Sequence, residues 1–198
     1  MSTESAVRER STSAQESWKL EQQLSGYKDL LVLMARGSPR DEVLNALVRF
    51  AQGITANPSR AAIFVMDASE AKLRFAAAAG LSEEYTAAID GFPVGPTMPS
   101  CGNAAYTGQA VIVHDVGADP LWAPYVELAK THGIAACWSF PLRRGKEILG
   151  TFALYHQRKC SPDEREYAEV EYLASIASLV LQRDDAGSRP AVSLRAAP

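Results

Sequence analysis

Cys101 is the residue whose type and position most favour chemistry. It follows Ser100, the residue expected to open a short helix over residues 100–106. The free amide groups and the positive dipole end at the start of a helix favour a thiolate or a bound anion. Free cysteines are also often small apolar side chains buried under loops. The sequence is therefore compatible with two interpretations of Cys101, a reactive thiol and a packing residue.

The other cysteines and the histidines form no local metal motif. Cys137 lies among small and apolar residues of a predicted strand, where core packing is expected, and Cys160 lies in a polar loop. His114, His132 and His156 are far apart, without the short spacing of a zinc site. A single histidine can still hold haem iron, so a haem or gas sensor remains an open alternative.

Aromatic residues supply the other candidate contacts. Tyrosine and tryptophan carry a polar tip that needs a partner, which favours a ligand cavity for at least one of them. In the predicted strand over residues 134–142, Cys137 and Ser139 share one face and Trp138 takes the other, but alternation alone does not say which face borders a cavity. The candidate ligand-binding residues are Cys101, Trp122, Tyr125, Cys137, Ser139 and Tyr155.

Helices are expected at both ends of the chain. Residues 16–36 carry apolar side chains at alternating spacings of four and three, which gives about two heptads and suggests dimerisation: Leu20, Leu24, Tyr27, Leu31 and Met34. A second helix follows, with Ser38 as its N-cap. A final helix is predicted to start at Ser161 as N-cap, with Glu164 completing a capping box, and to end near Arg183. Its wide apolar face should pack on a sheet and on a further partner.

Strands fill the middle of the chain. Residues 61–66 and 72–79 form a predicted hairpin, and a short helix over residues 81–89 follows with Ser82 as its cap. Residues 110–113 form a strand and residues 125–132 a helix. A second hairpin joins residues 134–142 to residues 147–157. Both faces of the last two strands are apolar, so both faces of the sheet should be covered.

Composition limits the function classes. The chain has 198 residues, and 20 Lys and Arg stand against 23 Asp and Glu, for a net charge of −3. This balance attracts neither nucleic acid nor an anionic membrane surface. No apolar run reaches the roughly 18 residues of a membrane span. The N-terminus lacks the apolar stretch of a signal peptide, so a cytoplasmic location is expected.

Residues 61–183 resemble the GAF domain family. The resemblance lies in residues 73–81, in SCGNAAYTGQAVIVHDVGADPLW (100–122), in YVELAKTHGIAACWSFPL (125–142) and in ILGTFALYH (148–156). It implies an α+β fold with a six-stranded antiparallel sheet, helices on both faces, and the N- and C-terminal helices packed together on one face. It also implies a ligand cavity on the opposite face. The expected organisation is a disordered 1–15, N-terminal helices over 16–57, a GAF domain over 58–183 and a disordered tail over 184–198.

Sub-types of that family carry signatures of their own. Covalent bilin attachment uses a cysteine where this chain has residues 119–124, which contain none, so no bilin is expected. The signature of cyclic-nucleotide binding does not align. Cys101-Gly102 looks like one cysteine site of the free methionine-R-sulfoxide reductases, but the other two cysteines depart from that pattern.

The resemblance implies a sensory or regulatory protein rather than an enzyme. We expect it to bind an unidentified small molecule and to signal through a homodimer or through a partner such as a histidine kinase. The cofactor, if any, is not identified. Two alternatives remain: a redox enzyme of the sulfoxide-reductase type that uses Cys101, and a dimerising scaffold that binds no ligand.

Overall fold

The chain divides into two compact units, Met1–Ser38 and Pro39–Pro198. The computed structural model describes residues 3–55 and 59–187. Helix α1 (Thr3–Ala35) forms the first unit. It includes residues 3–15, for which the sequence predicts disorder. That segment has no Gly or Pro to stop a helix that continues into the heptad region. Residues 188–198 of the predicted disordered tail lie outside the described residues.

The second unit is built on an antiparallel sheet of six strands. The strands are β1 (Ser59–Asp67), β2 (Lys72–Ala79), β3 (Phe92–Pro93), β4 (Val111–Val113), β5 (Ala136–Arg144) and β6 (Glu147–His156). Their order is β3-β2-β1-β6-β5-β4, and each neighbouring pair is antiparallel. This topology confirms the predicted fold class. Strand β3 has only two residues and is not among the strands that the sequence predicts.

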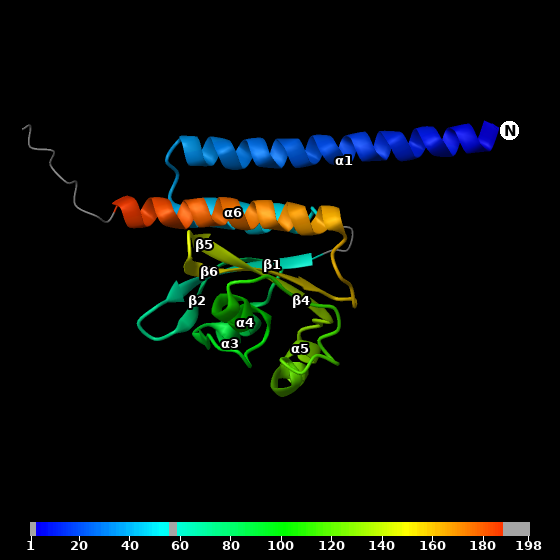
Figure 1. Ribbon diagram of the computed structural model, residues 1–198. Coiled ribbons are helices and arrows are strands. Elements are labelled where there is room, and N and C mark those ends of the chain that lie inside the picture. Colours follow the sequence, from blue (N-terminus) through cyan, green and yellow to red (C-terminus); the bar gives the residue numbers. More distant parts are fainter. Residues whose placement is uncertain (1–2, 56–58, 188–198) are drawn as a thin grey trace, which may run out of the picture. The chain divides into compact units, whose positions relative to one another are not determined.

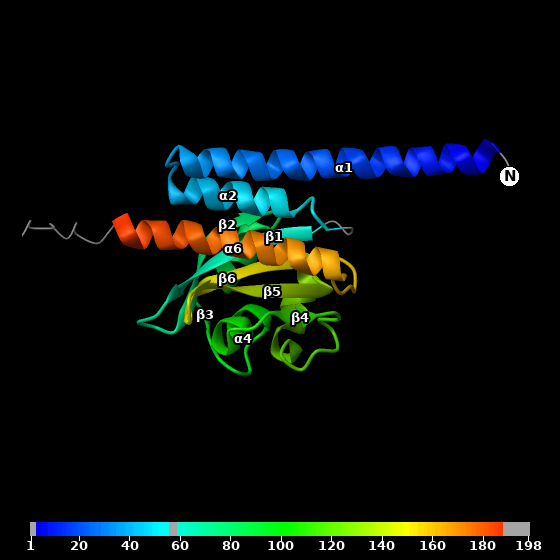
Figure 2. The ribbon, with the colours of Figure 1, turned by 45° about the horizontal axis from the view of Figure 1, so that its top comes forward.

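Helices cover both faces of the sheet (Figure 1). Helix α2 (Arg40–Ala51) and helix α6 (Glu164–Gly187) contact each other and lie side by side on one face (Figure 2). Helices α3 (Glu83–Ile89), α4 (Ser100–Thr107) and α5 (Val126–Thr131) lie on the other face, with a short 3-10 turn, η1 (Ala123–Tyr125), before α5. Strand β6 is buried along almost its whole length, as two apolar faces predict.

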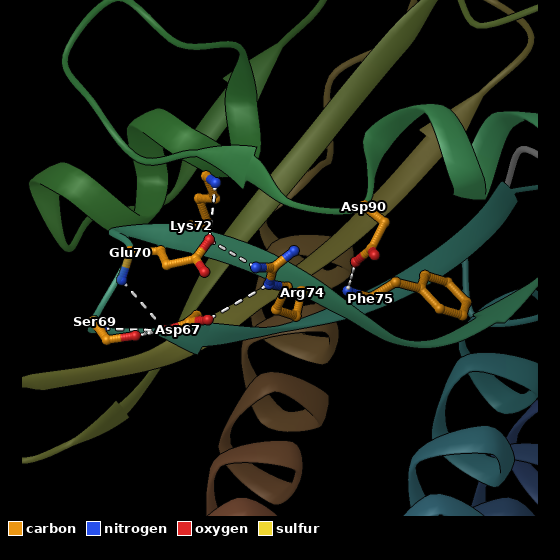
Figure 3. A network of polar contacts seen from close by, with 7 residues as sticks. All are labelled: Asp67, Ser69, Glu70, Lys72, Arg74, Phe75 and Asp90. Atoms are coloured by element: carbon orange, nitrogen blue, oxygen red, sulfur yellow. Dashed lines mark hydrogen bonds and ion pairs between the residues drawn. The ribbon is translucent and has the colours of Figure 1, made fainter.

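A surface network of polar side chains closes the hairpin between β1 and β2 (Figure 3). Asp67 Oδ1 accepts hydrogen bonds from the backbone amide of Ser69 at 3.1 Å and from its hydroxyl at 2.6 Å. Glu70 pairs with Lys72 at 2.8 Å and with Arg74 at 2.7 Å. The turn residues thereby satisfy their own polar groups, which is the local reason for the hairpin at this point.

Strand β3 is too short to pair with the whole of β2. It pairs only with Lys72 and Leu73. Beyond it, Asp90 Oδ1 accepts a hydrogen bond of 2.7 Å from the backbone amide of Phe75 (Figure 3). A carboxylate therefore replaces a strand partner and satisfies an edge amide that would otherwise have none.

The structure confirms one predicted N-cap residue and contradicts another. Ser82 caps α3 and accepts a hydrogen bond from the Tyr85 amide, as expected. The capping box of α6 lies two residues later than predicted: Asp163 accepts from the Glu166 amide at 2.7 Å, and Glu166 accepts from the Asp163 amide at 3.1 Å. The prediction of Ser161 as N-cap is therefore wrong, because an aspartate with a glutamate three residues on forms an equally good box.

Candidate functional site

A small cavity lies between the sheet and helices α3, α4 and α5. Its volume is about 30 Å³, far below the roughly 300–1,000 Å³ of a typical small-molecule site. Six aromatic rings dominate its wall: Phe64, Tyr85, Phe92, Trp122, Tyr125 and Tyr155. Leu73, Ile89, Pro99, Leu128 and Cys101 complete the wall. In this conformation the cavity has room for little more than water, so a larger guest requires the surrounding loops to move.

Helix α4 positions Cys101 at the cavity. Ser100 is buried at the first position of this helix, and its hydroxyl accepts a 2.9 Å hydrogen bond from Trp122 Nε1. Gly102 is also buried, and a side chain there would meet the carbonyl oxygen of Pro93 at 2.5 Å. The helix therefore sits directly against the loop that precedes it, and Cys101 turns toward the sheet.

Hydroxyl groups from two strands meet the Cys101 sulfur. Ser139 Oγ of β5 lies 3.2 Å from Cys101 Sγ, and the Tyr155 hydroxyl of β6 lies 3.8 Å from it. Cys137 stands directly opposite Tyr155 in the β5–β6 ladder, and its sulfur lies 3.8 Å from Ser139 Oγ. Two thiols and two hydroxyls thus form one cluster, to which we refer as the thiol cluster: Cys101, Cys137, Ser139 and Tyr155.

The two cysteines of the thiol cluster have pKa values shifted in opposite directions. Contact with the Cys137 thiol lowers the pKa of Cys101 to about 7 against the opposing effect of burial, with further contributions from the Ser139 and Tyr155 hydroxyls. Burial raises the pKa of Cys137 well above its ordinary value. Near neutral pH, a large fraction of Cys101 is therefore thiolate, whereas Cys137 remains a thiol because its charged form would be fully desolvated.

Tyrosines on the same face keep their protons. Desolvation raises the pKa values of Tyr85 and Tyr155 well above the ordinary tyrosine value. Their rings contact each other edge to face, with centroids 5.7 Å apart. At neutral pH both phenols are neutral hydrogen-bond donors within an apolar wall.

The structure places all six candidate ligand-binding residues in one region. Cys101, Trp122, Tyr125 and Tyr155 line the cavity itself, whereas Ser139 and Cys137 lie behind Cys101. Sequence reasoning missed the rings of Phe64, Tyr85 and Phe92. The apolar run over residues 61–66 was the available signal for Phe64, while Tyr85 and Phe92 reach the cavity only through the packing of α3 and β3.

None of the three histidines lines this cavity. His114 Nδ1 lies 3.4 Å from Ser161 Oγ, and His132 Nδ1 lies 3.2 Å from Ser82 Oγ. His156 is fully buried, with its ring 4.1 Å from that of Trp138. Within residues 3–55 and 59–187, no cluster of three or more His, Cys, Asp or Glu residues is arranged to hold a metal ion. Nor does any described helix have the length and apolarity to cross a membrane.

Comparison with known proteins gives both sequence and fold relatives. A family model described as GAF domain matches residues 37–182. A methyl sulfide methyltransferase-associated sensor from Methanosarcina acetivorans is 33% identical over 161 residues, which make up 79% of this chain and 16% of that protein. The chain therefore corresponds to only about a sixth of the length of that relative.

Two solved structures share the fold. One is a domain assigned to a two-component sensor histidine kinase from Sinorhizobium meliloti, with 26% identity, a TM-score of 0.62, and coverage of 75% of this chain and 96% of that one. The other is a free methionine-R-sulfoxide reductase from Neisseria meningitidis in complex with its substrate, with 17% identity, a TM-score of 0.61, and coverage of 75% and 81%. The second likeness shows the fold alone.

Proposed function

Because this chain belongs to the GAF domain family, we propose that it is a cytoplasmic sensory protein that binds a small molecule in the cavity beside Cys101. The single observation that carries the proposal is the wall of that cavity, where six aromatic rings surround one thiol. The similarity to a sensor protein and to a domain of a sensor kinase supports a regulatory role.

The wall indicates the class of ligand. Aromatic and aliphatic side chains make up nearly all of it, and no Lys, Arg, Asp or Glu among the described residues lines it. A charged ligand would lose its hydration without gaining an ionic partner. The expected ligand is therefore a small, largely apolar molecule with one or two groups that can hydrogen-bond to a tyrosine hydroxyl or to Cys101.

Ligand entry requires the cavity to expand. Tyr125 and Phe92 contact each other edge to face, with centroids 5.0 Å apart, and each belongs to a segment outside the central strands. Separation of these two rings would enlarge the cavity and leave the sheet in place. A ligand that binds the open arrangement better would shift the population toward it.

The signal would reach other molecules through terminal helices. Leu20, Leu24 and Leu31 of α1 are all more than half exposed, and they belong to the predicted heptad. Tyr172 and Leu179 of α6 are also exposed and lie seven residues apart, so they share one face of that helix. We propose that such faces pair in a homodimer or contact a partner such as a histidine kinase.

Native mass spectrometry of gently purified protein tests ligand binding. We expect an additional mass that disappears on denaturation, and Tyr125→Ala should lose it. Tyr106→Ala is the matched control, because Tyr106 is 58% exposed on α4 and does not line the cavity. A bare chain that no apolar metabolite stabilises in a thermal-shift screen would refute the sensor proposal and favour a ligand-free scaffold.

Sedimentation tests the proposed homodimer, since a monomer mass at every concentration would refute it.

A second candidate is a redox enzyme of the sulfoxide-reductase type. The lowered pKa of Cys101 favours it, since a thiolate is the nucleophile that such chemistry needs. Turnover of free methionine sulfoxide that Cys101→Ser abolishes would support this function. Wild-type protein without any turnover would exclude it.

A further inference from the structure

We propose that Cys101 and Cys137 form a reversible disulfide when a hydroperoxide oxidises the Cys101 sulfur at the cavity. This site goes beyond the proposed function, because it requires neither the small-molecule ligand nor turnover of methionine sulfoxide. The oxidant belongs to the class of small hydroperoxides, of which hydrogen peroxide is the simplest.

The geometry brings the two thiols to one hydroxyl. Ser139 Oγ lies 3.2 Å from Cys101 Sγ and 3.8 Å from Cys137 Sγ. Helix α4 packs against β5, so the backbones that carry the two cysteines are already neighbours. Cys137 and Ser139 are two residues apart and therefore point to the same side of β5. Both cysteines are free thiols in this structure.

Unequal exposure assigns different roles to the two thiols. Cys101 is partly exposed and lines the cavity, whereas Cys137 does not, so a small oxidant that enters the cavity would meet the Cys101 sulfur first. Cys137 is fully buried beneath it, where only Cys101 and its neighbours are in reach. The lowered pKa of Cys101 and the raised pKa of Cys137 agree with this division. Cys101 would attack the oxidant, and Cys137 would resolve the product.

The chemistry balances in two steps. The Cys101 thiolate attacks one peroxide oxygen, an S–O bond forms and the O–O bond breaks. Sulfur loses two electrons to give a sulfenic acid, and the leaving hydroxide, or the alkoxide of an organic peroxide, takes a proton from solvent and departs as water or an alcohol. The Cys137 sulfur then attacks Cys101 Sγ, the S–S bond forms and the S–O bond breaks. The hydroxide that leaves takes the Cys137 proton and departs as water.

Cys160 provides an internal comparison. Its backbone carbonyl accepts a 3.1 Å hydrogen bond from Trp138 Nε1, and Trp138 points to the side of β5 opposite Cys137. The sheet therefore separates Cys160 from the thiol cluster. Its removal should leave the chemistry of Cys101 unchanged.

Peptide mapping of the full chain tests the proposal without any substitution. Reduced, desalted protein is treated with hydrogen peroxide, its remaining thiols are alkylated, and the tryptic peptides are analysed without reduction. We expect an intramolecular link between the Cys101 and Cys137 peptides, an intact mass lower by two hydrogens, an alkylated Cys160, and full reversal by dithiothreitol. Free Cys101 and Cys137 after treatment would overturn the proposal, as would a link to Cys160 or between two chains.

Two variants then identify the intermediate. In Cys137→Ala, the sulfenic acid on Cys101 should persist and react with dimedone, which adds a defined mass to the Cys101 peptide. Cys160→Ala is the matched control and should give the same disulfide yield as wild type. Absence of the dimedone adduct from folded Cys137→Ala protein would contradict the order of steps. The wild-type map decides the disulfide itself and does not depend on the folding of either variant.

Discussion

The Cys101 sulfur lies 3.2 Å from the hydroxyl oxygen of Ser139, although 37 residues separate them along the chain. This contact joins a helix start to the middle of a strand. The sequence left Cys101 as either a packing residue or a reactive thiol. The structure combines the two, because Cys101 packs under a loop and its sulfur also contacts polar hydroxyl groups. The lowered pKa of this half-buried thiol predicts that it is more reactive than an ordinary packed cysteine.

The reactivity of Cys101 should depend on the Cys137 thiol and, to a smaller extent, on the hydroxyls around it. Its pKa of about 7 predicts that alkylation by iodoacetamide accelerates as the pH rises through 7, because the thiolate is the reacting form. Ser139→Ala should raise this midpoint by about one pKa unit, since a hydrogen bond to a charged group is lost. Tyr155→Phe should have a smaller effect, because its hydroxyl is 3.8 Å away. The alkylation rate of the Cys101 peptide as a function of pH gives this midpoint for the wild type and for both variants. A midpoint unchanged by Ser139→Ala would show that the Ser139 hydroxyl does not stabilise the Cys101 thiolate.

Ser100 should matter for stability through Trp122. Ser100→Ala leaves the buried Trp122 Nε1 without its 2.9 Å acceptor, so we expect a loss of about 1–3 kcal/mol in the free energy of unfolding. Urea denaturation measures this loss. In a Trp122→Phe background, which has no indole N–H, the same substitution should cost clearly less. Equal costs in both backgrounds would show that the hydrogen bond contributes nothing.

His156 should make the protein sensitive to acid. Burial, with a smaller effect of Arg60, lowers the pKa of His156 from 6.5 to about 4. Between these values the unfolded chain binds the proton and the folded chain does not, so stability is present above pH 6.5 and decreases as the pH falls toward 4. The shift corresponds to a loss on the order of 3 kcal/mol.

His156→Phe is the variant that tests this acid sensitivity. It keeps a ring against Trp138 and removes the titration. Neither His156 ring nitrogen has a hydrogen-bond partner among the described residues, so replacing the imidazole with a phenyl ring should remove no hydrogen bond. Urea denaturation at pH 7 and at pH 4.5 should show a smaller loss of stability in the variant. A parallel loss in both proteins would place the acid sensitivity elsewhere.

Gly102 should control the position of α4. A Cβ at this residue would meet the Pro93 carbonyl oxygen at 2.5 Å and Met98 Cβ at 2.6 Å. Gly102→Ala should therefore push α4 away from the preceding loop, at a cost of about 1–3 kcal/mol, and increase the access of alkylating reagents to Cys101. Gly53→Ala is a useful comparison for steric effects, because a Cβ there would meet only the Phe50 carbonyl oxygen, at an ordinary contact distance of 3.8 Å. Unchanged stability and unchanged Cys101 reactivity in Gly102→Ala would refute this role.

Local patterns of the sequence determined most of the elements. Ser82 was found as a cap because a serine hydroxyl satisfies an amide within the same turn, and the two long hairpins were found because each alternates between polar turns and apolar strands. Local patterns also misplaced the start of α6, since Ser161 with Glu164 and Asp163 with Glu166 are competing boxes of the same kind. The two residues of β3 were too few to give a periodic signal.

The sequence by itself thus determined the fold class, the residue types of the candidate site and the alternation of Cys137 and Ser139 on one face of β5. Only the tertiary structure decided that this face meets α4 and the cavity, because an alternating pattern is identical for both sides of a strand that is buried on each. It also decided that Cys101 lies between Ser139 and Tyr155. That contact depends on packing between segments that are distant in sequence, and such packing produces no short-range residue pattern from which it could be predicted.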